Sequence, residues 1–161
     1  MKKNGNLLLI GVLSLLSLLS SCFEPKLDTP EKLLQHYVYL SFAGTDDKEL
    51  EGHLSEEFLK KIKEEQASSP TGSRQISFKN LKLKNYKMLN KMCEQENICQ
   101  LRFEISYEEK NPTSEKIEFQ TDTKKLAVIK RLANNEWKID EIDHLKTVHD
   151  MKSQIDVPLK E

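Results

Sequence analysis

The chain has 161 residues, of which 37% are hydrophobic and 32% charged, and its formal net charge is −1. This length suits one domain with a single core. The near-balanced charge gives no reason to expect nucleic acid or a strongly anionic membrane as a partner. Five glycines and five prolines are too few for a low-complexity chain or a sandwich with many turns.

The first 21 residues have the pattern of an export signal. Lys2 and Lys3 precede an apolar run over residues 7–19, and small residues follow. Because a cysteine stands directly after the expected cut, Leu19-Ser20-Ser21-Cys22 resembles a bacterial lipobox. The resemblance implies that residues 1–21 are removed. It also implies that Cys22 is linked to diacylglycerol, becomes the mature N-terminus and is acylated.

Two other interpretations of this segment stay open. A transmembrane helix would need about 20 apolar residues, and this run is shorter. An ordinary signal peptide with an incidental cysteine has the same composition. An aspartate after the lipid-bearing cysteine resembles a retention signal for the inner membrane of Gram-negative cells. Phe23 stands there, which favours the outer membrane if the cell is Gram-negative, with residues 22–28 as a lipidated tether.

Three helices are expected after the tether. Thr29-Pro30-Glu31 supplies a hydroxyl N-cap, a proline at the first helical position and an acid in the first turn. Apolar residues follow at three- and four-residue spacings until Gly44, which is suited to end the helix. Asp46 predicts a second, short helix, and Ser55 is the expected N-cap of a third. A loop is predicted over residues 66–73.

The hydrophobic period then changes to two, which predicts strands. Odd-numbered residues over 99–107 are apolar and the even-numbered ones polar, so this strand should have one buried and one wet face. The apolar run 126–129 predicts burial on both sides of the next strand. Asn134-Asn135 predicts a hairpin turn before a last strand that begins at Trp137 and Ile139.

Cys93 and Cys99 flank a polar, turn-like segment. Antiparallel pairing centred on Glu96 would place the two cysteines opposite each other, where Cα atoms are close enough for a disulfide. An exported, oxidising setting would let the bond form. The loop is short, so the bond should contribute about 2 kcal/mol. The alternatives are two buried free thiols, or redox or metal chemistry. A metal site would need a second ligand pair, which is lacking, and the spacing does not resemble a CxxC redox motif.

Helices followed by a meander of four strands predict an α+β fold class, with the N-terminal helices packed on an antiparallel sheet. The domain is expected over residues 29–143. The spacing of Leu145, Val148, Met151 and Ile155 predicts a C-terminal amphipathic helix over 144–161, with a frayed, extended tail as the alternative.

The order of elements and the ending Asn134-Asn-Glu-Trp-Lys-Ile-Asp-Glu-Ile142 resemble the nuclear-transport-factor-like, cystatin-like cone superfamily over residues 29–143. Many small bacterial members, including lipoproteins of unassigned function, end in a similar turn. The resemblance implies a curved, cone-like sheet around a pocket that the helices close. Some members place Asp and His there for catalysis, others bind small molecules, and many only bind proteins.

No motif of a known catalytic or metal centre occurs in the sequence, and no cofactor is expected. His144 and His149 are off-register for one helix face. Asp140, Glu141 and Asp143 could supply a general base, although alternation favours a solvated sheet face. Aromatic residues are expected mainly in the core; if the cone pocket is open, its lining would include Tyr37, Phe103, Tyr107, Phe119 and Trp137.

These features predict a lipid-anchored envelope protein that is not an enzyme and that binds another envelope protein or assists assembly. The alternative is a carrier or sensor of a small apolar ligand in the cone pocket. An enzyme of unknown reaction is the third hypothesis.

Overall fold

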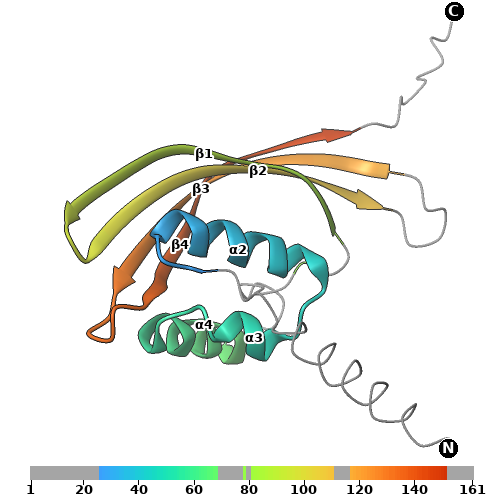
Figure 1. Ribbon diagram of the computed structural model, residues 1–161. Coiled ribbons are helices and arrows are strands. Elements are labelled where there is room, and N and C mark those ends of the chain that lie inside the picture. The colour runs from blue at the N-terminus through green and yellow to red at the C-terminus, as the bar shows by residue number, and fades with distance from the viewer. Residues whose placement is uncertain (1–25, 69–77, 79–80, 111–116, 152–161) are drawn as a thin grey trace, which may run out of the picture.

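The computed structural model describes residues 26–68, 78, 81–110 and 117–151. Helices come first and strands follow, so the predicted α+β class is confirmed (Figure 1). The predicted lipobox with Cys22 and the tail from residue 152 lie outside the described residues. The elements are α2 (Pro30–Ala43), α3 (Asp47–Glu51), α4 (Glu56–Ser68), β1 (Leu81–Gln95), β2 (Ile98–Lys110), β3 (Ile117–Arg131) and β4 (Trp137–Met151).

The helices begin and end where local chemistry predicts. The Thr29 hydroxyl oxygen accepts a hydrogen bond of 3.3 Å from the backbone N–H of Lys32, which caps α2. Gly44 ends α2 with a φ of 79°, a conformation that glycine adopts without the steric cost of a Cβ. The Ser55 hydroxyl caps α4 by accepting from the N–H of Phe58 at 3.1 Å. Helix α4 continues to Ser68, three residues into the predicted loop.

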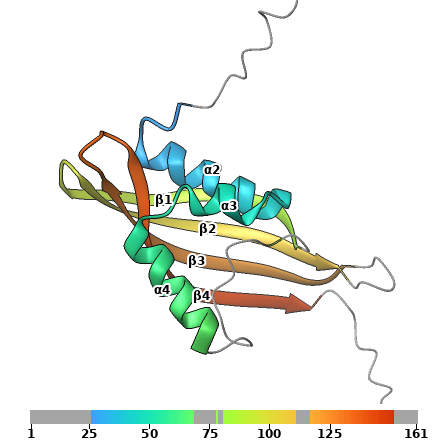
Figure 2. The ribbon, with the colours of Figure 1, turned by 90° about the horizontal axis from the view of Figure 1, so that it is seen from below.

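The four strands form one antiparallel sheet in the order β1-β2-β3-β4. The meander is the predicted one, and Asn135 has the positive φ (67°) that its hairpin turn needs. The sheet bends around α2, and α2 and α4 both lie on one side of it (Figures 1 and 2). We call this side the helix-covered face. The opposite side, which none of the described helices covers, is the open face.

The core lies between α2, the α3–α4 segment and the helix-covered face. Phe103 in the middle of β2 is 1% exposed and lies opposite Met88 of β1 and Lys125 of β3. Burying each large apolar side chain contributes about 1.5–3 kcal/mol, so this cluster holds the layers together. Its other fully buried members are Leu33, Leu34, Leu50, Leu101, Ile105, Ala127, Ile129 and Ile139.

The expectation that residues 126–129 are buried on both sides is wrong. Ala127 and Ile129 are fully buried on the helix-covered face, but Leu126 and Val128 on the open face are only half-buried. The physical reason is that the helices pack against one side of the sheet, so alternate residues of β3 have no layer above them.

The expected helix over residues 144–161 is wrong for its described part, and the domain boundary at residue 143 falls inside a strand. β4 continues to Met151 and pairs with β3, with His149 opposite Thr121. A register shift between Lys124/Lys125 makes Leu145 an extra residue on β4. This bulge breaks the two-residue alternation, and the resulting spacing to Val148 imitates a helical one.

Candidate functional site

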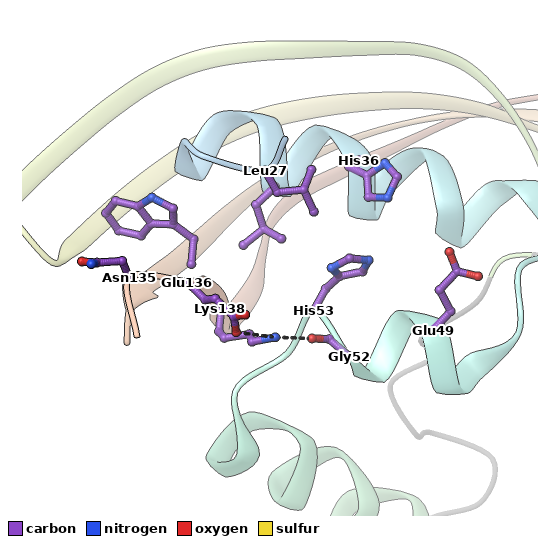
Figure 3. Close-up of a pocket in the computed structure, with 10 residues that line it drawn as sticks. Leu27, His36, Glu49, Gly52, His53, Asn135, Glu136 and Lys138 are labelled. Carbon is purple, nitrogen blue, oxygen red and sulfur yellow. Dashed lines mark hydrogen bonds and ion pairs between the residues drawn. The ribbon is translucent and has the colours of Figure 1, made fainter. Parts of the chain in front are cut away.

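A cavity of about 580 Å³ opens between α2, α3 and the start of β4 (Figure 3). Its volume lies within the range of sites that bind small molecules. The lining combines apolar, aromatic and charged side chains from segments that are far apart in the sequence. The residues are Leu27, Leu33, His36, Glu49, Gly52, His53, Asn135, Glu136, Trp137 and Lys138.

Two histidines meet at this cavity. His36 on α2 and His53 after α3 have ring centroids 5.3 Å apart and planes at 89°, an edge-to-face contact. Burial lowers the pKa of His53, and the nearby His36 and Lys138 lower it further. The His53 imidazole is therefore held in its neutral form at neutral pH, in which one ring nitrogen donates and the other accepts.

The floor of the cavity is fixed to the edge of the sheet. The Lys138 ammonium donates a 2.5 Å hydrogen bond to the carbonyl oxygen of Gly52 and lies 3.7 Å from the Glu136 carboxylate. Residues 53–55 pair with Ile139, whose N–H donates to the His53 carbonyl at 2.9 Å and whose carbonyl accepts from the Ser55 N–H at 2.8 Å. The segment between α3 and α4 thus extends the sheet beside β4.

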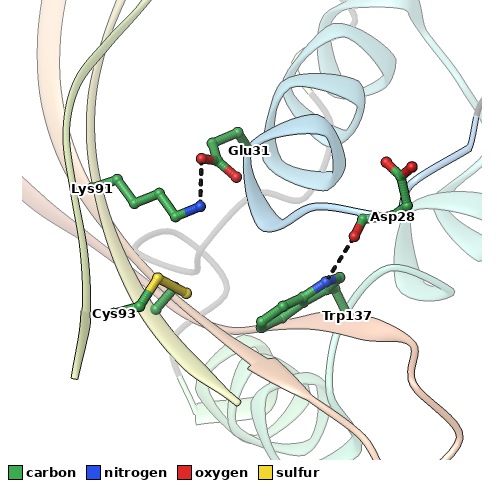
Figure 4. Close-up of a disulfide and its surroundings, with 6 residues drawn as sticks. Asp28, Glu31, Lys91, Cys93 and Trp137 are labelled. Atoms are coloured by element: carbon green, nitrogen blue, oxygen red, sulfur yellow. Dashed lines mark hydrogen bonds and ion pairs between the residues drawn. A yellow bond between two sulfur atoms is a disulfide. The ribbon is translucent and has the colours of Figure 1, made fainter. Parts of the chain in front are cut away.

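The segment before α2 is seated on the same site. The indole N–H of Trp137 donates to the carbonyl oxygen of Asp28 at 3.2 Å (Figure 4), and Leu27 lines the cavity. The Arg131 guanidinium lies 5.5 Å from the centroid of the Trp137 ring, a cation–π contact. The last described residues of the predicted tether are therefore bound to the domain.

The predicted disulfide is confirmed. The register places Cys93 of β1 opposite Cys99 of β2, and the two sulfur atoms are bonded with Cα atoms 4.1 Å apart. Close by, the Lys91 ammonium forms a 2.6 Å ion pair with Glu31 at the start of α2 (Figure 4). Both contacts fix the end of the molecule at which the tether residues lie.

The predicted pocket residues do not gather at one site. Trp137 lines the cavity described above. Tyr37 and Phe103 lie in the core instead, at 7% and 1% exposure. Tyr107 is half-buried with its ring 5.6 Å from that of Phe42, and Phe119 is half-buried on β3.

Two of the three acidic residues considered as a general base, Asp140 and Glu141, are engaged in structural contacts. Asp140 accepts a 2.8 Å hydrogen bond from the Ser55 hydroxyl and forms a 2.7 Å ion pair with Lys130. Glu141 pairs with Lys61 at 3.0 Å. The contacts with Ser55 and Lys61 join α4 to β4, and the ion pair with Lys130 joins β4 to β3. Within the described part of the chain, no three His, Cys, Asp or Glu side chains are arranged to hold a metal ion.

Sequence reasoning missed a buried lysine. Lys125 is 7% exposed on the helix-covered face, with its ammonium 5.3 Å from the centroid of the Phe78 ring. Burial lowers its pKa to about 8. It shares the odd-numbered phase of the buried Ala127 and Ile129, and this phase is the signal that could have identified it.

Comparison with family models, curated proteins and solved structures found no match to this chain. The likeness to the cone superfamily therefore stays a prediction from the order of elements. None of the helices in the described ranges combines the length and the apolar character that crossing a bilayer requires.

Proposed function

We propose that this chain is a lipid-anchored protein of the bacterial envelope that is not an enzyme and that binds another envelope protein or assists its assembly. The leader pattern ending at Cys22 supports the anchor. The Cys93–Cys99 disulfide suits an exported, oxidising setting. In a Gram-negative cell, Phe23 after the cysteine favours the outer membrane.

The observation that carries this proposal is the seating of the tether residues on the domain. The Asp28 carbonyl oxygen accepts a hydrogen bond from the Trp137 indole, and Leu27 lines the cavity. Leu27 is five positions after Cys22, a distance of roughly 18 Å at full extension. The β1–β2 and β3–β4 turns lie at this same end (Figure 2). Lipidation at Cys22 would therefore hold this end near the membrane and direct the other end of the sheet away from it.

The open face is the surface that we assign to a protein partner. One of its rows alternates apolar and polar side chains, from Met92 through Gln100 to Val128, and the row from Lys87 through Glu104 and Lys124 to Lys146 is charged throughout. Met92 is 48% exposed, and Gln100 and Val128 are half-buried. A non-obligate protein interface is about as apolar as the rest of a protein surface, so the mixed composition of this face is compatible with one. The ion pairs of Asp140 and Glu141 support a non-enzymatic role, because both acids already have structural partners.

Site-specific photo-cross-linking in intact cells tests the partner. A cross-linkable residue in place of Arg102, exposed in the middle of the open face, should trap a second protein, whereas the same residue in place of Glu64 on α4 should not. Equal labelling at both positions, or none at Arg102, would contradict binding through the open face.

The anchor is tested separately. Cys22→Ala should move the chain from the membrane fraction to the soluble fraction. A mutant that remained with the membrane after losing residues 1–21 would contradict lipidation at Cys22 and leave the cross-linking result unaffected.

A second candidate function is the binding of a small ligand in the cavity, as in a carrier or sensor. The cavity of about 580 Å³ favours it, and the histidines, Glu49 and Lys138 suit a ligand with polar groups better than a wholly apolar one. Trp137 is the single tryptophan, so its fluorescence reports on this cavity. A small-molecule extract of the envelope should change that emission in the wild type and not in His53→Leu; an unchanged wild-type spectrum would remove this candidate.

A further inference from the structure

We propose that two copies of this chain pair through the outer edge of β4, which would continue the four-stranded sheet into one of eight strands. The strand order leaves β1 and β4 at the edges. At its start, β4 is covered by residues 53–55, which pair with Ile139. From residue 142 to 151, no strand in the described part of the chain pairs with this outer edge.

The two edges differ in how they are protected. β1 carries four lysines and three register shifts, both of which discourage another strand from pairing with an edge. The end of β4 carries one lysine and one register shift, at Leu145, which lies before residues 146–150, and residues 144–150 are all exposed. Leu145 and Val148 are 52% and 48% exposed there. Of the two edges, β4 is therefore the one suited to accept a strand.

The segment Lys146-Thr147-Val148-His149-Asp150 is complementary to itself. An antiparallel pair related by a two-fold axis at Val148 places Lys146 opposite Asp150 of the second copy, and Asp150 opposite Lys146. Thr147 then faces His149, a combination that β3 and β4 already form, since the Thr121 hydroxyl and His149 Nδ1 are 2.9 Å apart. The axis brings Val148 against its own copy. Such a contact is isologous and closes as a dimer.

The charges favour this register over its neighbour. Inside the sheet, Lys146 lies opposite Lys124 and Asp150 lies opposite Gln120, so neither has an opposite charge across the ladder. The second copy would supply one to each. Centring the axis on Thr147 would place Lys146 opposite Val148 and lose both pairs. Opposite charges directly across strands stabilise pairing, and like charges weaken it.

Charge exchange tests the pairing in the full mature chain, purified from membranes in detergent. Sedimentation should give the mass of a dimer for the wild type. Lys146→Asp and Asp150→Lys should each raise the dimer dissociation constant about tenfold, because each sets like charges opposite each other twice. The double exchange should restore the wild-type value, and Lys87→Asp on the β1 edge should leave it unchanged. A monomeric wild type, or single exchanges without effect, would overturn the proposal.

A cross-link tests the two-fold axis directly. In Val148→Cys the two new thiols would lie on opposite strands within disulfide reach, so the exported chain should form a covalent homodimer. Arg102→Cys, exposed on the open face of β2, is the matched control and should stay monomeric. If residues 152–161 or another protein occupy the edge instead, Val148→Cys gives no homodimer, and that outcome also overturns the proposal.

Discussion

The indole N–H of Trp137 donates to the backbone carbonyl oxygen of Asp28 across a sequence separation of 109 residues. This hydrogen bond joins the first strand position after the β3–β4 turn to the segment that enters α2. The contact matters for function because it decides where the free part of the tether begins. A chain that is seated from Leu27 onward has a shorter reach than one that leaves the domain at Thr29.

Trp137→Phe should loosen this seating. The substitution keeps an aromatic ring but removes the donor, which at this exposed bond should cost about 1 kcal/mol. That loss corresponds to about a fivefold increase in the ratio of unseated to seated chain. Limited trypsin digestion measures it, because Lys26 is exposed next to the seated residues. Cleavage after Lys26 should be about fivefold faster in the variant and unchanged in Tyr39→Phe, an exposed control; equal rates in all three proteins would contradict the role of the indole.

Lys125→Met should stabilise the fold at neutral pH. Burial lowers the Lys125 pKa from 10.5 to about 8, so the folded state disfavours the charge by about 3 kcal/mol. The contact with Phe78 offsets about 1 kcal/mol of this, which leaves an expected gain of about 2 kcal/mol. The wild type should itself gain stability as the pH rises from about 8 towards 10.5, because the unfolded chain then binds more protons than the folded one.

Urea unfolding at pH 7 and at pH 10 checks the lysine prediction. The advantage of Lys125→Met should shrink at the higher pH. Lys124→Met removes an exposed neighbour and should show no such dependence on pH. A variant that is less stable than the wild type at both pH values would show that the Lys125 ammonium stabilises the fold.

The features that could be predicted from sequence are local ones. Thr29, Gly44 and Ser55 act through groups within four residues of themselves, so their roles follow from residue type. The Cys93–Cys99 pair follows from a short hairpin whose register is set by its own turn. The alternation of β2 was reliable because one of its faces is wet.

What the sequence pattern missed depends on distant partners. His36 and His53 meet because the α3–α4 segment pairs with β4, and neither residue's neighbours indicate that pairing. Residues 144–151 are a strand because β3 is long enough to pair with them, although the bulge at Leu145 disguises the period. Lys125 is buried because the helices cover its side of the sheet, and which side they cover depends on the packing of the whole domain.

Loss of the disulfide should destabilise the fold modestly. It closes a short loop, so the expected cost of reduction is about 2 kcal/mol. Urea unfolding with and without reductant measures this for the wild type. Cys93→Ala removes the exposed partner and should abolish the response to reductant while leaving the buried Cys99 in place. A wild type whose unfolding ignores reductant would show that the bond contributes nothing to stability.

His53 should titrate below the ordinary histidine pKa of 6.5, and His36 should be one cause of this. Burial is the larger cause, so His36→Gln should raise the His53 pKa without returning it to 6.5. The folded state disfavours the charged form of the ring. The neutral ring therefore contributes to the free energy of unfolding above pH 6.5, and this contribution is lost as the pH falls through the pKa of the folded state. Titration of the His53 ring protons by NMR in the two proteins checks this.

Gln35→Ala is the control, because Gln35 is the exposed neighbour of His36 on α2. The same His53 pKa in all three proteins would show that the two rings are not electrostatically coupled.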